Sequence, residues 1–217
     1  MSWTVRRAEA ADAPALALVA GATFLETFHA ITPVADMVAH VTNKSSAAAF
    51  AAWIADRQAT VFYAAGARTG APLGYAVLTA PDFPVPTDAR DAELRRIYTL
   101  AATHGTGLGA ALMQAALDEA SLRERKRVLL GVHPDNVRAR RFYERTGFRV
   151  VGERIFTVGA SRFVDPIYAL DLYVRGFSRA QIASTFARVP PRSRSRMLSN
   201  RSDRPCSMRP SVRHTTS

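Results

Sequence analysis

The spacing of apolar and polar positions along the chain predicts a succession of short strands and helices. Apolar and polar residues alternate over residues 3–7, which is typical of a half-buried strand. From Asp12 to about Phe28 the pattern predicts a helix, with Asp12 as its N-cap and Pro14 in its first turn. Two further short helices are expected within residues 32–56. The other expected elements follow in this order: strands at 60–65, 72–79 and 92–101, a helix from 107 to about 124, a strand at 127–132, a helix at 136–146, and strands at 148–156 and 163–173.

This order of elements predicts the fold class. The turn segment 66–71 separates two strands, which favours an antiparallel hairpin. From residue 92 onward strands alternate with helices, as they do in crossover units with parallel strands. We therefore predict an α/β (α+β) fold with a mixed, mostly antiparallel central sheet of about seven strands, flanked by helices. The domain is expected to cover residues 1–174.

Three glycines, Gly105, Gly107 and Gly109, stand where a predicted strand gives way to a predicted helix. Glycine is costly inside a helix, but at a helix start it lets a bulky anion approach the backbone closely. The unpaired N–H groups and the helix dipole at such a start favour a phosphate. The segment lacks the Gly-Lys-Ser/Thr of a P-loop and the spaced third glycine of a dinucleotide fingerprint. A turn with no ligand is the alternative to a phosphate site.

A second segment carries a recognisable set of residues: Asn136, Ala139, Phe142–Tyr143 and Gly147–Phe148. Together with the glycine segment it resembles the GCN5-related N-acetyltransferase (GNAT) superfamily, over about residues 3–173. Within that superfamily the chain is most similar to bacterial small-amine acetyltransferases related to polyamine acetylation. The resemblance implies acetyl-coenzyme A as cosubstrate and direct acetyl transfer to the primary amine of a small molecule in a ternary complex.

The resemblance also implies a set of residues that bind the coenzyme. The glycine loop holds the pyrophosphate, although His104 stands where the superfamily has Gln or Arg. The pantetheine arm lies along the edge of the strand that ends at residues 98–100, as an added strand would. The expected coenzyme-binding residues are Tyr98, Thr99, Leu100, His104, Gly105, Thr106, Gly107, Leu108, Gly109, Ala110, Asn136 and Tyr143.

Tyr143 is the candidate general acid of the reaction. By the resemblance its counterpart lies near the coenzyme sulfur, and a phenol with a pKa of about 10 keeps its proton at pH 7. The alternative is that Phe142 and Tyr143 form only an aromatic helix face. Asn136 is expected to cap the helix and, by the resemblance, to hydrogen-bond the coenzyme as well.

Glu93 is the candidate general base. It lies fourteen residues before Gly107, and a glutamate at that spacing serves as base in histone-type members of the superfamily. Strand alternation is expected to place Glu93 on one face with Arg95, Ile97 and Thr99. The alternative is a surface glutamate paired with an arginine. Glu26, near the end of the first helix, is a weaker candidate.

The formal charge of +11 is concentrated at one end of the chain. Residues 175–217 hold ten Arg and one acid, whereas the preceding 174 residues hold 19 Lys and Arg against 17 Asp and Glu. This tail is rich in Arg, Ser and Pro and poor in apolar residues, so we expect it to be disordered. A basic arm for nucleic acid or anionic lipid is the alternative, but residues 188–217 lack the aromatic side chains on which bases stack.

Other functions and sites find less support in the residues. Two alternatives to small-amine acetylation stay open: acetylation of a peptide N-terminus or lysine, and a non-catalytic acyl-coenzyme A-binding module or tail-dependent nucleic-acid binder. The loop 80–91 carries three aspartates, which form either a solvated loop or an acidic rim that attracts amines. The histidines lack ligand spacing and the single cysteine, Cys206, lies in the tail, so we expect neither a metal site nor an acyl-cysteine.

The N-terminus bears on the location of the protein. Arg6 and Arg7 precede an apolar stretch, as in some export signals, but Glu9 and Asp12 interrupt it. No apolar run approaches the ~20 residues of a membrane span. We therefore expect a cytoplasmic protein without a membrane partner, and a homodimer stays open as its assembly.

Overall fold

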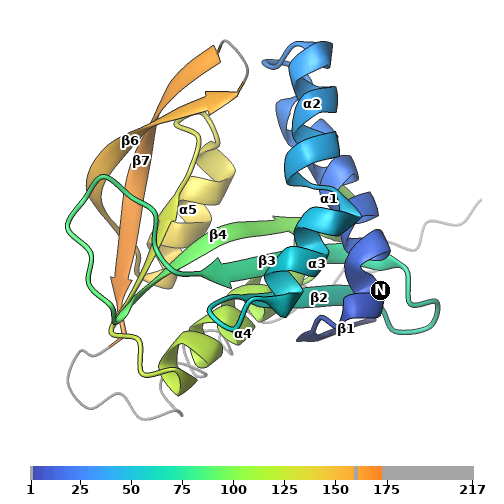
Figure 1. The fold of residues 1–217 in the computed structure, drawn as a ribbon, viewed down its shortest axis with the longest axis horizontal. Helices are drawn as coiled ribbons and strands as arrows, with labels where there is room; N and C mark the ends of the chain where they lie inside the picture. The colour runs from blue at the N-terminus through green and yellow to red at the C-terminus, as the bar shows by residue number, and fades with distance from the viewer. Residues whose placement is uncertain (1, 159–160, 173–217) are drawn as a thin grey trace, which may run out of the picture.

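A seven-stranded sheet organises the chain, which the computed structural model describes for residues 2–158 and 161–172. The strand order is β1-β2-β3-β4-β5-β7-β6, and every neighbouring pair is antiparallel except β4–β5 (Figure 1). This confirms the predicted mixed, mostly antiparallel sheet. The strands are β1 (Trp3–Arg7), β2 (Thr60–Gly66), β3 (Pro72–Thr79), β4 (Asp91–Thr99), β5 (Arg127–Gly131), β6 (Arg149–Val158) and β7 (Ser161–Asp171).

Helices cover both faces of this sheet, as predicted. They are α1 (Ala13–Phe28), α2 (Val34–Lys44), α3 (Ala47–Ala55), α4 (Leu108–Leu122) and α5 (Val137–Thr146), with short 3₁₀ turns η1 (Ala10–Asp12) and η2 (Ala101–Thr103). Tyr75 and Val77 of β3 pack with α1 and α3, while Ala76 and Leu78 pack on the opposite face with α4. Because β3 is buried on both faces, its sequence is apolar throughout instead of alternating.

Helix α1 begins where the sequence predicted, but its expected N-cap acts differently. Asp12 makes no side-chain capping hydrogen bond to α1. Its carboxylate instead pairs with the Arg6 guanidinium at 2.6 and 2.7 Å and accepts a hydrogen bond from the Glu9 N–H at 2.7 Å. The Arg6 guanidinium and the Glu9 N–H engage both oxygens of the carboxylate, so Asp12 ties α1 to β1 instead of capping the helix.

One helical stretch in the described part of the chain, Ala10–Phe28, is long and apolar enough to span a membrane by length and composition. This is weak evidence, since the core helix of a soluble protein has the same properties. Leu16, Val19 and Phe24 of this stretch are buried in the fold. Spaced three to five residues apart, they form the inward face of an ordinary core helix.

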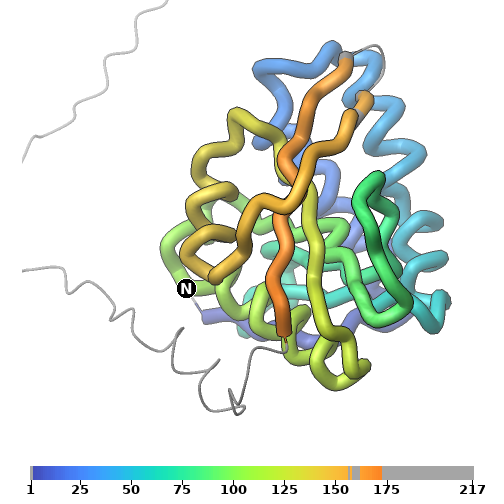
Figure 2. The backbone as a smooth tube through the Cα atoms, turned by 90° about the vertical axis from the view of Figure 1, so that its left-hand side faces the viewer, coloured from blue at the N-terminus to red at the C-terminus, as the bar shows by residue number. Residues whose placement is uncertain are grey.

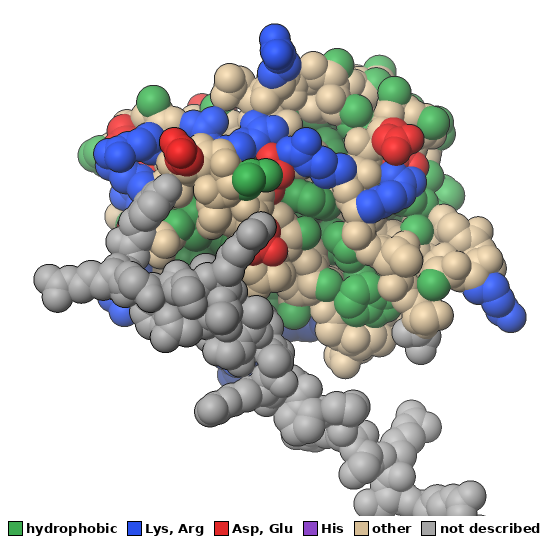
Figure 3. Space-filling view, turned by 90° about the horizontal axis from the view of Figure 1, so that it is seen from below, with side chains coloured by type: hydrophobic (Ala, Val, Ile, Leu, Met, Phe, Trp, Pro, Cys, Tyr) green, Lys and Arg blue, Asp and Glu red, His purple; other side chains and the backbone are tan. Residues whose placement is uncertain are grey.

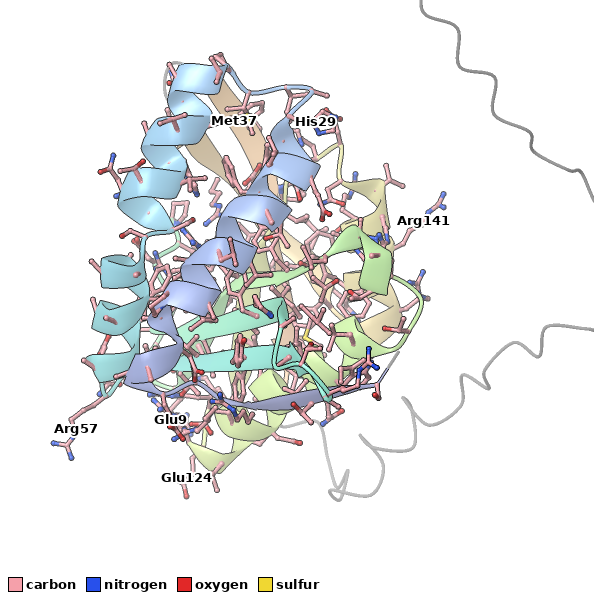
Figure 4. The ribbon with its side chains drawn as sticks, turned by 90° about the vertical axis from the view of Figure 1, so that its right-hand side faces the viewer. Glu9, His29, Met37, Arg57, Glu124 and Arg141 are labelled. Carbon is pink, nitrogen blue, oxygen red and sulfur yellow. The ribbon has the colours of Figure 1, made fainter. Side chains whose placement is uncertain are left out.

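The β6–β7 hairpin and the α1–α2 pair stand on two sides above the central strands (Figure 1). Figure 2 shows the hairpin running beside β5, in agreement with the antiparallel pairing of β5 and β7. His29 and Met37 lie at this end of the molecule, whereas Arg57 and Glu124 lie at the opposite end (Figure 4). The expected domain boundary at residue 174 and the basic tail 175–217 lie outside the described residues.

Candidate active site

The glycine loop presents a set of backbone amides at the start of α4. Gly105 and Gly107 have φ angles of +79° and +89°, a left-handed conformation that favours glycine, and Gly107 is the N-cap of α4. No atom lies within 4 Å of where a Cβ on Gly105 or Gly109 would be. The amides of five residues make no hydrogen bond within the described structure: Gly105, Gly107, Leu108, Gly109 and Ala110. Open backbone, free N–H groups and the positive end of α4 together suit the pyrophosphate of a coenzyme.

Side chains around this loop complete its shape. Leu108 is fully buried and anchors the first turn of α4. The Thr106 hydroxyl donates to the carbonyl of Thr103 at 2.7 Å, which fixes the loop internally. His104 is exposed, and its Nδ1 contacts Nη1 of Arg138 from the first turn of α5. An arginine therefore lies at the rim of the loop, beside the histidine that replaces Gln or Arg. Arg138 could not be predicted from the sequence, because only the fold brings α5 to this loop.

Strands β4 and β5 separate above the loop. They pair only from Asp91–Arg127 to Glu93–Leu129, although β4 continues to Thr99. Beyond Glu93 the edge of β4 that faces β5 pairs with no strand of the described residues. The expected pantetheine residues Tyr98, Thr99 and Leu100 lie at the end of this free edge and are partly buried.

The predicted face of β4 was wrong beyond Glu93. The β3–β4 register shifts so that Val77 pairs with Arg96 and Leu78 with Leu94, which leaves Arg95 as an extra residue, a β-bulge. The bulge reverses the alternation after it. Ile97 therefore packs in the core against α4, while Glu93, Arg96 and Tyr98 face the side of α1 and α3.

Tyr143 lies in an aromatic cluster under this separation. Its α5 helix begins as predicted: Oδ1 of Asn136 accepts a hydrogen bond from the Ala139 N–H at 3.1 Å, which confirms Asn136 as N-cap. Tyr143 is 7% exposed, with its ring centroid 6.0 Å from Phe148 and 6.3 Å from Tyr168. Burial, with a smaller effect of the Tyr98 phenol, raises the pKa of Tyr143. The phenol thus carries its proton at neutral pH, and no described residue hydrogen-bonds its oxygen.

Glu93 is buried on the opposite face, 2% exposed, and not on the surface. Its Oε2 accepts hydrogen bonds from the Asp82 N–H at 3.0 Å and from Nη2 of Arg95 at 2.9 Å. Oε1 lies 4.0 Å from Nη1 of Arg154 on β6. Burial raises the pKa of Glu93, and the charges of Arg95 and Arg154 oppose that rise. Glu93 therefore pairs with an arginine, as the alternative expected, but it is buried and not a surface residue.

The other acidic candidates have structural partners. Glu26 is exposed, and its Oε2 accepts a hydrogen bond from the Ala101 N–H at 3.0 Å, which fixes η2 between β4 and the glycine loop. Asp91 is buried and pairs with Arg127 at 2.6 Å. Asp88 pairs with Lys126. Asp82 and Asp88 are both exposed, and Oδ2 of Asp82 lies 3.8 Å from Nη2 of Arg95. Among the described residues, no group of three or more His, Cys, Asp or Glu could hold a metal ion.

Known proteins resemble this chain in sequence and in fold. The model of the acetyltransferase (GNAT) family matches residues 26–148. Two uncharacterised N-acetyltransferases, from Mycobacterium tuberculosis and Mycobacterium bovis, are 38% identical over 162 residues, which are 74% of this chain and 98% of theirs. The structure of the PaiA N-acetyltransferase from Thermoplasma acidophilum in complex with coenzyme A has a TM-score of 0.65 at 22% identity, over 79% of this chain and 99% of that one. The ribosomal-protein-S18-alanine N-acetyltransferase from Escherichia coli has a TM-score of 0.59 at 21% identity, over 81% and 97%.

The chain belongs to the GNAT acetyltransferase family and is an N-acetyltransferase. Its cosubstrate is acetyl-coenzyme A, and the free amides at the start of α4 fit that molecule.

Proposed function

We propose that the enzyme transfers the acetyl group of acetyl-coenzyme A directly to the primary amine of a small molecule, in a ternary complex in the cytoplasm. One observation carries this proposal. Strands β4 and β5 part beyond Glu93, with the buried Glu93 carboxylate on one face of the sheet and the buried Tyr143 phenol on the other. A thioester that enters this gap meets a proton acceptor on one side and a proton donor on the other.

The amides of the glycine loop hold the pyrophosphate, and Arg138 adds a cation at the rim. The main chain of residues 98–100, at the free edge of β4, pairs with the amides of the pantetheine arm. The arm thus takes the place of a strand where β5 has turned away.

Each protein group has a defined part in the transfer. Glu93 takes a proton from the amine, either directly or through a water. The amine nitrogen forms a bond to the thioester carbonyl carbon, and the carbon–sulfur bond breaks. Tyr143 gives its proton to the leaving thiolate and regains one from solvent, while Glu93 releases to solvent the proton that it took, so that protons balance over the cycle. No acyl-enzyme is needed, and the single thiol, Cys206, lies outside the described residues.

A screen of acceptors tests the proposal. Purified protein is incubated with acetyl-coenzyme A and polyamines, amino acids, aminoglycosides or peptides, and free thiol is measured. We expect thiol release with at least one small primary amine, and release with peptides alone would favour a peptide acetyltransferase instead.

The variant Tyr143→Phe tests whether Tyr143 is the general acid of the reaction. The ring stays and the proton donor is lost, so kcat should fall about 100-fold while coenzyme binding stays near that of the wild type. Tyr168→Phe is the matched control, because it removes a hydroxyl from the same cluster, one that bonds Glu144 and Arg140. Turnover that survives in Tyr143→Phe removes the acid role.

A further inference from the structure

Two buried polar atoms, an acceptor and a donor, stand without a hydrogen-bond partner near Glu93. Asp165 is 3% exposed, and its Oδ1 receives no hydrogen bond from any described residue. Nε2 of His133 is also buried and without such a partner. The Asp135 N–H donates to Nδ1 of His133 at 3.2 Å, so the ring proton sits on Nε2. Unpaired buried groups cost stability, which indicates that another molecule completes them.

The two atoms belong to one place in the fold. Asp165 is on β7, and His133 follows the end of β5, the neighbouring strand (Figure 2). The Val132 N–H still bonds the Pro166 carbonyl at 3.3 Å, so the register continues past the strand end and sets His133 opposite Asp165. Opposite residues of an antiparallel pair share a face. Burial raises the pKa of Asp165, and the charge of Arg154 opposes that rise.

Arg154 links this pair to Glu93. It stands opposite Asp165 in the β6–β7 register, with Nε 3.6 Å from Asp165 Oδ2 and Nη1 4.0 Å from Glu93 Oε1. A Cβ on Gly131 would lie 2.5 Å from Cζ of Arg154, so the absence of a side chain at Gly131 leaves room for the guanidinium against β5. Arg154 thus forms an ion pair with Asp165 through Oδ2, and Oδ1 is available to accept a hydrogen bond from another donor.

Aromatic side chains flank the pair on both sides. The His133 ring lies edge-on to Phe28 of α1, at 6.3 Å between centroids, and to Phe163 of β7, at 4.6 Å. Phe28 belongs to an apolar cluster with Phe24 and Met37, against which Tyr98 packs. The pair therefore lies between the α1–α2 and β6–β7 elements, on the face of the sheet that Glu93 occupies (Figure 1).

We propose that Asp165 and His133 bind the acceptor, with Asp165 Oδ1 accepting a hydrogen bond from its amine and His133 Nε2–H donating to an oxygen of the same molecule. The acceptor class is then a primary amine with a hydrogen-bond-accepting oxygen close to its nitrogen, as in an amino acid amide, and not a plain alkylamine or polyamine. This inference rests on the proposed function and specifies its substrate.

Two small amines of similar size test it: glycinamide, which carries the oxygen, and n-propylamine, which lacks it. At saturating acetyl-coenzyme A, thiol release gives kcat and KM for each amine. The wild type should prefer glycinamide in kcat/KM. His133→Phe keeps the ring between the two phenylalanines and removes the N–H, so this preference should fall at least about tenfold, through KM. His133→Gln restores a donor and should restore the preference.

Asp165→Asn should raise KM for both amines at least about tenfold, with unchanged affinity for acetyl-coenzyme A in calorimetry. Asp171→Asn, an exposed aspartate on the same strand, is the matched control and should behave as the wild type. Thermal melting confirms that each variant is folded. An unchanged amine ratio in folded His133→Phe, or an unchanged KM in Asp165→Asn, would overturn the inference while acetylation itself stands. Wild-type protein that acetylates no amine in either experiment contradicts the proposed function instead.

Discussion

At the scale of single residues, the position of Glu93 in the fold depends on local sequence, and its burial depends on contacts with distant segments. Its place at the start of β4 follows from the local pattern. Its burial depends on the 80–91 loop, which donates the Asp82 N–H to it, and on Arg154 from a distant strand. The strand pattern alone placed Glu93 with Ile97, because it carried no sign of the bulge at Arg95.

Glu93→Gln should lower kcat/KM about 100-fold, if this residue is the base. A base acts only when deprotonated, so wild-type kcat/KM should fall as pH falls through the pKa of Glu93. Because that pKa is raised, this limb lies above the ordinary carboxylate range. The limb should vanish in Glu93→Gln. A limb that persists unchanged shows that another group titrates, and Asp165, whose pKa burial also raises, is then the next residue to test.

A stability measurement separates this effect from unfolding. The folded protein favours the protonated form of Glu93, so its contribution to stability is full below the unfolded-state pKa and is lost as pH rises through the raised pKa. At a pH where Glu93 is deprotonated, glutamine at this position avoids the cost of burying a negatively charged carboxylate. We expect the melting temperature of Glu93→Gln at pH 7–8 to be no lower than that of the wild type.

Residues that act together from different elements were beyond the sequence analysis. Tyr143 and Asn136 could be proposed from the sequence because both belong to one helix with a clear start. Arg138, His133 and Asp165 were not among the residues that the sequence indicated. Each acquires its surroundings only through contacts made across the fold, as His133 does with Phe28 and Phe163. The absence of hydrogen-bond partners for the buried atoms of Asp165 and His133 within the described residues cannot be predicted from a sequence.

At the scale of elements, the junction of β4, η2 and α4 places three glycines beside backbone amides that make no hydrogen bond within the described residues. Gly107 caps α4 with a positive φ, and the first amides of the helix have no intrahelical partner, as at any helix start. This junction could be predicted because turn chemistry is local. The separation of β4 from β5 could not be predicted from the sequence, because it depends on which strands pair with each other.

Gly107→Val should weaken coenzyme A binding at least about tenfold, about 1.4 kcal/mol, by straining the left-handed turn and crowding the anion. Gly70→Val is the matched control. Gly70 also has a positive φ, +69°, with nothing within 4 Å of its Cβ position, but it lies in the β2–β3 turn. Both variants should lose some stability, and only Gly107→Val should lose affinity in calorimetry. Equal affinities in the two folded variants would remove the glycine loop from the coenzyme site.

At the scale of the whole molecule, the predicted number of strands and the mixed sheet were confirmed, whereas the order β5-β7-β6 was not predicted. That order sets β7 beside β5 and so brings Asp165 to His133. On the face drawn in Figure 3, Lys and Arg lie among Asp, Glu and apolar side chains.

The last prediction concerns the basic tail, and it separates catalysis from binding to polyanions. Every residue proposed for the reaction lies before the end of β7 at Asp171. Deleting residues 180–217 removes eight Arg and one Asp. Folding, acetyl-coenzyme A affinity and turnover should therefore stay almost unchanged in the truncated protein.

The same deletion should abolish salt-sensitive retention on heparin, because such retention scales with the number of cations that contact the polyanion. A truncated protein that is insoluble or inactive would show that the domain needs the tail. Retention that survives the cut would place a basic surface on the domain, and α5 would be the first place to mutate. Its Arg138, Arg141 and Arg145 are exposed and spaced three to four residues apart, and Arg141 extends away from the fold (Figure 4).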